Sequence, residues 1–153
     1  MPVKINYKTN LLTKSSSNLV LFSNENFDIS FLKKHLLSKE YSFIRDLLKN
    51  TDLKKKIITF DISSKKKIIL ISISKNIKSS EVENLGAKFY DTVKDFKFNE
   101  YELNTDTISS DIKNLVGHFL HGLMLKSYNF QKPVLESVHV MVNLGSVFQE
   151  ILL

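Results

Sequence analysis

The chain has 153 residues, of which 42% are hydrophobic and 25% charged, proportions typical of one globular domain. It contains no cysteine, which excludes a disulfide framework, thiolate zinc sites and a cysteine nucleophile. No stretch approaches the roughly 20 apolar residues of a membrane helix, and the N-terminus lacks the apolar core of a signal peptide. These features predict a cytoplasmic protein with no membrane partner.

The net charge of +6 comes almost wholly from lysine, and two lysine runs are the candidate nucleic-acid site. Arg45 is the only arginine, and arginine is the residue that most often reads bases through paired hydrogen bonds. The charge therefore supports only the non-specific electrostatic part of binding, and a solvated lysine-rich surface is the favoured interpretation. The two runs are Lys54, Lys55 and Lys56, and Lys65, Lys66 and Lys67.

Apolar runs and alternating patterns predict strands, whereas capping residues followed by apolar stripes predict helices. In the first part of the chain these signals predict strands at 3–7 and 18–22 and helices at 30–37 and 43–48. Strands at 57–62 and 68–71 are separated by a tight turn, so we expect them to pair as a hairpin. The continuous β-branched run at 68–71 is typical of an interior strand. The sheet is therefore expected to be mixed.

Ser80 and Glu83 have the spacing of a capping box and predict the start of a helix that extends to about residue 96. A further helix is predicted at 108–125, after an edge strand at 101–103. Glycine inside a helix costs about 1 kcal/mol relative to alanine. We therefore expect close packing against a neighbouring element to offset Gly86, Gly117 and Gly122.

The segment at 133–153 is mostly apolar, and its pattern leaves two interpretations open. Val138, Val140 and Val142 alternate as in a strand. Val147 and the apolar residues at 151–152 instead fit one side of a short helix.

No complete catalytic motif is present. His118 and His121 have a spacing that can bind a metal from one helix face, but their stripe offers no third ligand, so structural or surface histidines are favoured. Gly117 and Gly122 have the glycine spacing of a P-loop, but Leu123 and Met124 replace its lysine and hydroxyl. Only four glycines occur in the chain, which disfavours a glycine-rich phosphate loop.

Gly122, Leu125, Tyr128 and Phe130 form a Gly-x-x-Leu-x-x-Tyr-x-Phe ending after the last predicted helix. This ending resembles the end of the N-terminal domain of the leucyl (cytosol) aminopeptidase family, where it precedes the linker to the catalytic domain. The earlier strands, the hairpin and the helix around 84–87 follow the order found in that domain. The resemblance covers roughly residues 1–130, and residues 131–153 form an unaligned apolar tail.

The resemblance implies a macro-domain-like α/β fold, with a mixed sheet flanked by helices. In the family, a separate catalytic domain binds two divalent metals, zinc or manganese, and removes N-terminal amino acids from peptides. The family assembles as homohexamers, which implies self-association for this chain.

The family's metal-binding signature, Asn-Thr-Asp-Ala-Glu-Gly-Arg, is missing, and Asn104-Thr105-Asp106 matches only its beginning. We therefore carry over no catalytic or metal-binding residue and expect no cofactor in this chain. The function expected is that of a non-catalytic domain in assembly or regulation. The chain would be a truncated or frame-shifted product or a stand-alone relative. The alternatives are a small basic nucleic-acid-binding module and a macro-like domain that binds ADP-ribose.

Overall fold

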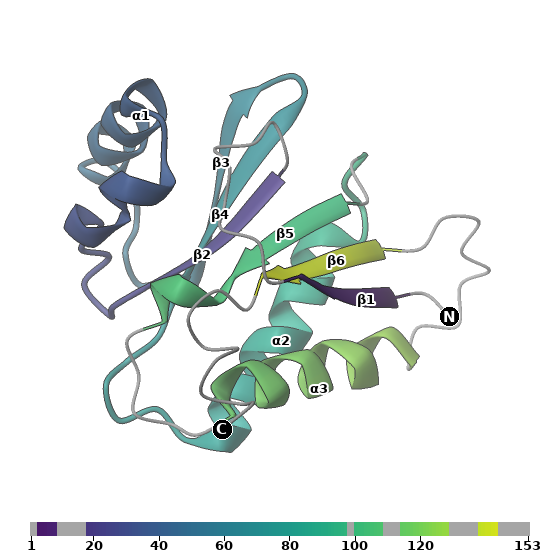
Figure 1. The fold of residues 1–153 in the computed structure, drawn as a ribbon. Helices are drawn as coiled ribbons and strands as arrows, with labels where there is room; N and C mark the ends of the chain where they lie inside the picture. The colour runs from purple at the N-terminus through teal and green to yellow at the C-terminus, as the bar shows by residue number, and fades with distance from the viewer. Residues whose placement is uncertain (1–2, 9–17, 98–99, 109–113, 129–137, 144–153) are drawn as a thin grey trace.

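A six-stranded mixed sheet with helices on both faces forms the fold, as the sequence predicted (Figure 1). The computed structural model describes residues 3–8, 18–97, 100–108, 114–128 and 138–143. The sheet order is β1-β6-β5-β2-β4-β3. In chain order the elements are β1 (Val3–Lys8), β2 (Asn18–Ser23), the 3₁₀ helix η1 (Ser30–His35), α1 (Ser38–Leu48), β3 (Ile57–Ser63), β4 (Lys66–Ser72), α2 (Ser79–Val93), β5 (Glu100–Asn104), the 3₁₀ helix η2 (Thr105–Thr107), α3 (Leu115–Tyr128) and β6 (Val138–Asn143).

All neighbouring strands are parallel except β3 and β4, which form the predicted antiparallel hairpin. β4 lies between β2 and β3, and its residues at 68–71 are fully buried. Successive side chains of β4 enter opposite faces, so Ile68 and Leu70 pack on one side and Ile69 and Ile71 on the other. This arrangement confirms the prediction of an interior strand covered on both faces.

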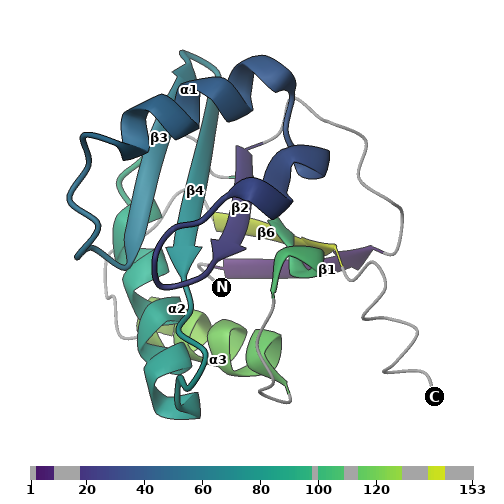
Figure 2. The same cartoon turned by 90° about the vertical axis from the view of Figure 1, so that its left-hand side faces the viewer.

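Two apolar clusters fill the two faces of the sheet. The larger joins α2 and α3 to the sheet, and Phe22, Phe89 and Phe119 lie at its centre. The smaller joins η1 and α1 to the other face, through Leu32 and Ile44. Figure 2 shows α1 over β3 and β4, with α2 and α3 on the opposite side of the sheet. Within the described ranges no helix has the length and apolar character needed to cross a membrane.

Two of the three helical glycines allow α2 and α3 to approach closely. A Cβ at Gly86 would overlap the carbonyl oxygen of Phe119, and one at Gly122 would overlap that of Glu83. The expected offset is therefore confirmed for these two residues. It is wrong for Gly117, which is exposed and whose added Cβ would meet only the Asn114 Cβ at 3.7 Å.

Two strand predictions change in the structure. β5 is an interior strand between β6 and β2, not the predicted edge strand, because β6 pairs with its free side. The strand interpretation of Val138, Val140 and Val142 is confirmed, and β6 joins the sheet between β1 and β5. Residues 144–153, including the alternative helix, lie outside the described residues.

The helix boundaries also differ from the predicted ones. The segment predicted as a helix at 30–37 is a 3₁₀ helix that ends at His35, and the next helix begins at Ser38 instead of residue 43. The prediction of a capping box at Ser80 and Glu83 is wrong, because α2 begins at Ser79 and its N-cap, Lys78, forms no side-chain cap. α3 begins at Leu115 instead of residue 108, while Ile108 directly follows η2.

Candidate functional site

The carboxyl ends of five parallel strands lie along one edge of the sheet. After β2 the chain leads through η1, α1 and β3 to β4 on one side, whereas after β5 it leads through η2 and α3 to β6 on the other. The connections therefore diverge between β2 and β5. Open α/β sheets bind ligands at such a topological switch point, which makes this place the candidate functional site.

Buried polar side chains at the switch point bond to the chain itself. Asn104, at the end of β5, is fully buried, and its Oδ1 accepts a hydrogen bond from the backbone N–H of Asp106 at 2.9 Å. The Thr107 hydroxyl accepts from the backbone N–H of Phe22 at 2.9 Å and donates to the Asn104 carbonyl at 2.8 Å. These bonds tie β2 to β5 and leave these groups already engaged.

His35 of η1 reaches the same place, with its Nδ1 3.0 Å from Nδ2 of Asn104. Because the Asn104 oxygen accepts from Asp106, its amide nitrogen faces His35 as a donor. Burial lowers the pKa of His35, Lys34 lowers it further, and Asp106 opposes the shift. In the neutral ring, Nδ1 then accepts and Nε2 carries the hydrogen. Nε2 is buried and has no hydrogen-bond partner among the described residues.

Two grooves lie away from the switch point. One, of about 150 Å³, lies where β4 meets α2 and is bordered by Lys56, Ser72 and Lys88. The other, of about 250 Å³, lies along β1, β6 and β5, and Glu102 and His139 border it.

The structure separates the two predicted lysine runs. Lys54, Lys55 and Lys56 precede β3 and are exposed, whereas the run at 65–67 lies in the turn between β3 and β4 and at the start of β4. β3 spans seven residues, so about 20 Å separates the runs. They therefore do not form one continuous site.

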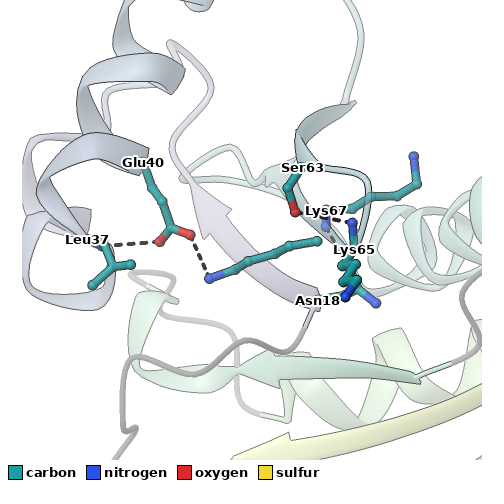
Figure 3. Close-up of polar contacts among 7 residues, drawn as sticks. Asn18, Leu37, Glu40, Ser63, Lys65 and Lys67 are labelled. Carbon is teal, nitrogen blue, oxygen red and sulfur yellow. Dashed lines mark hydrogen bonds and ion pairs between the residues drawn. The ribbon is translucent and has the colours of Figure 1, made fainter.

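Two of the lysines in the second run bind carboxylates within the protein. Figure 3 shows the carboxylate of Glu40 between a lysine ammonium and Leu37. Lys66 is buried, and its Nζ lies 2.6 Å from Oε2 of Glu40 in α1. The other oxygen of Glu40 accepts from the backbone N–H of Leu37 at 3.2 Å. Lys67 pairs with Asp61 of β3 and lies over the ring of Phe96. Lys65 remains exposed in the turn.

His118 and His121 both face Glu83 across the contact of α2 and α3. Oε1 of Glu83 lies 3.2 Å from Nδ1 of His121 and 3.7 Å from Nδ1 of His118. The sequence analysis did not connect Glu83 with the two histidines, because Glu83 belongs to another helix. Among the described residues no group of three or more histidines and carboxylates is arranged to hold a metal ion.

The remaining residues singled out in the sequence have structural positions. Asn104-Thr105-Asp106 forms the end of β5 and the beginning of η2. Leu125 and Tyr128 of the aminopeptidase-like ending are exposed on α3, whereas Phe130 lies outside the described ranges. His35 is an isolated histidine in the sequence, and no pattern of spacing connects it to β5.

Comparison with solved structures relates the fold to two proteins. The macrodomain of DarG from Thermus aquaticus is 11% identical, with a TM-score of 0.62 over 92% of this chain and 98% of that one. A mutant form of tomato leucine aminopeptidase is 15% identical, with a TM-score of 0.62 over 97% of this chain. The chain spans about a third, 34%, of that enzyme. No family model and no curated protein matches the sequence.

These identities establish a likeness of fold. The chain has the mixed α/β architecture of a macrodomain, with a six-stranded sheet flanked by helices. Both neighbours have this architecture over nearly the whole of the present chain. Function therefore has to be argued from the residues.

Proposed function

We propose that the chain is a non-catalytic domain of the leucyl aminopeptidase type that acts in assembly or regulation. The observation that carries this proposal is the alignment of 97% of the chain with about a third of the tomato enzyme. The ending at Gly122 adds support, because this glycine allows the α2–α3 contact. The divalent metals of the family do not fit the described residues, which offer no suitable ligand group.

Exposed apolar side chains on η1 and α1 support a role in assembly. Phe43 and Leu47 lie four residues apart on α1 and are 43% and 39% exposed, so they lie on one side of the helix. Leu37 and Phe31 add further exposed apolar area just before them. Burial of such side chains stabilises contacts between subunits.

The proposal is tested by the mass of the complete chain in solution, measured by light scattering over a range of concentrations. We expect oligomers, with the hexamer of the family as the largest closed form. Phe43→Ser combined with Leu47→Ser is expected to shift the mass toward the monomer. The matched control, Ser42→Ala with Asp46→Ala on the same helix, leaves the mass unchanged. A monomer at every concentration contradicts the assembly role.

A second measurement tests the absence of catalysis. The purified chain is incubated with leucine p-nitroanilide and manganese, and release of p-nitroaniline is followed. We expect no release above the background without protein. Turnover that co-purifies with the chain contradicts a non-catalytic role.

The alternative is a macro-like domain that binds ADP-ribose. It is supported by the DarG macrodomain, because the alignment covers 98% of that protein. The side chains of Asn104 and Thr107 at the switch point already form hydrogen bonds with the backbone. This argues against the alternative, because these groups are not free to bind a ligand. Calorimetry with ADP-ribose decides between the two functions. Heat of saturable binding that is lost in His35→Ala favours the alternative.

A further inference from the structure

A lysine-rich surface surrounds the groove where β4 meets α2. The polar residues that border the groove are Lys56 and Lys88, the carboxylate-bearing Glu81, the hydroxyl-bearing Ser72 and Ser74, and Asn84. The backbone carbonyl of Lys56 accepts from the N–H of Ser72 at 2.8 Å, which fixes the lysine run beside the end of β4. The groove therefore holds two ammonium groups against one carboxylate, beside neutral hydrogen-bonding groups.

Two exposed lysines, Lys56 and Lys88, border the groove, and four more lie in the segment just before β3 and in the segment between β4 and α2. We name these six residues the β4-end lysines. None forms an ion pair with another described residue, unlike Lys66 and Lys67 at the opposite end of the hairpin. Glu81 borders the same groove, and Asp52 and Asp91 lie within three residues of these lysines, so the six lysines outnumber the carboxylates near them. The β4-end lysines are Lys54, Lys55, Lys56, Lys75, Lys78 and Lys88.

From this arrangement we propose that the β4-end lysines bind the phosphodiester backbone of duplex DNA. Ammonium groups that neutralise phosphates displace condensed counterions, and hydroxyl and amide groups supply further phosphate contacts. The residues that border the groove include no arginine for base reading and no aromatic ring for stacking on unpaired bases. The surface therefore fits the backbone of a duplex and carries no sequence preference.

The spacing of the lysines on α2 suits a row of phosphates. Lys78 is the N-cap of α2, and Lys88 lies ten residues further along, about 15 Å at the rise of a helix. A duplex covers this length in about four base-pair steps. Lys56 borders the groove together with Lys88, and the exposed Lys54 and Lys55 directly precede it in the chain.

The test is fluorescence anisotropy of a labelled mixed-sequence duplex with the complete chain at increasing salt. The probe variant is Lys54→Gln with Lys55→Gln and Lys56→Gln. We expect a dissociation constant at least about tenfold higher at low salt, and a salt slope smaller by about one unit per lysine. A second variant, Lys75→Gln with Lys78→Gln and Lys88→Gln, is expected to behave alike, and it replaces the first if that one fails to fold.

The matched control removes the same charge elsewhere, with Lys34→Gln, Lys39→Gln and Lys97→Gln, all exposed in the wild type. We expect the control to bind nearly as tightly as the wild type. An equal loss in control and probe variants overturns the proposal, because net charge alone then explains the binding. No binding of the wild type at low salt, or tighter binding of an unpaired strand than of the duplex, overturns it as well. These outcomes do not depend on the proposed aminopeptidase-type function.

Discussion

The two helical layers of the molecule are attached to the sheet by different means. α2 and α3 contact each other backbone to backbone at Gly86 and Gly122 and cover the larger apolar cluster. The η1–α1 layer covers the smaller cluster, and a buried ion pair between Glu40 and Lys66 anchors it to β4. The first layer therefore depends on the close approach of two helix backbones, whereas the second adds a buried ion pair to its apolar contacts.

This difference determines which substitutions each layer tolerates. A layer held by close backbone contact is sensitive to one added methyl group, because a carbonyl cannot move aside as a side chain does. A layer anchored by a buried pair is sensitive to the loss of either partner, since the remaining charge is left without compensation. Three substitutions test this contrast.

The largest effect is expected for Lys66→Met, which keeps the length of the side chain and removes its charge. Glu40 then remains buried without its partner, and the free energy of unfolding is expected to fall by about 3–5 kcal/mol. Chemical denaturation followed by circular dichroism measures the change.

Two controls accompany this variant. Lys65→Met alters an exposed residue of the same run and is expected to change stability by less than about 0.5 kcal/mol. Glu40→Gln combined with Lys66→Met removes both charges and is expected to recover most of the loss. A single variant as stable as the wild type contradicts the anchoring role of the pair.

An intermediate effect is expected for Gly122→Ala, whose new methyl group would overlap the Glu83 carbonyl. α2 and α3 must separate to admit it, and we expect a loss of about 1–3 kcal/mol. Gly117→Ala is the matched control in the same helix, because it has space for the methyl group. It is expected to stabilise the protein by about 0.5–1 kcal/mol through helix propensity. Equal effects of the two substitutions would show that the helices do not contact at Gly122.

The smallest effect concerns His35 in the η1–α1 layer. Burial lowers its pKa from 6.5 in the folded chain, so the unfolded chain binds the proton more readily. This contribution to stability is complete above that value and declines as the pH falls through it toward the folded pKa. Denaturation at pH 8 and pH 5 is expected to show a smaller acid loss for His35→Gln than for the wild type. An identical loss would mean that His35 does not titrate differently on folding.

Local patterns in the sequence predicted features that depend on adjacent residues and failed where the partner comes later in the chain. The run at 68–71 indicated an interior strand, and the short turn after it indicated a hairpin, because both depend on adjacent residues. The glycines of α2 and α3 indicated a close neighbour, as Gly86 and Gly122 confirm. The prediction that β5 is an edge strand was wrong, because its second partner, β6, comes much later in the chain.

The spacing of residues in the sequence did not predict the candidate site, because its contacts join segments that are far apart in the chain. His35 meets Asn104 from a segment 69 residues earlier, and Glu83 meets His121 from 38 residues earlier. The lysine runs look alike in the sequence, yet Glu40 and Asp61 bind only one of them. Charge patterns show which groups are present, but only the fold shows which of them are neutralised.

The insertion of β6 between β1 and β5 has a consequence for synthesis of the chain. In the described part of the protein β1 hydrogen-bonds to β6 alone, so β1 has no partner strand until β6, much later in the sequence, has been made. A nascent chain released from the ribosome only as far as residue 130 presents unsatisfied edges at both β1 and β5. Unpaired strand edges can pair with other chains, and the pairing of β6 with β1 and β5 removes them.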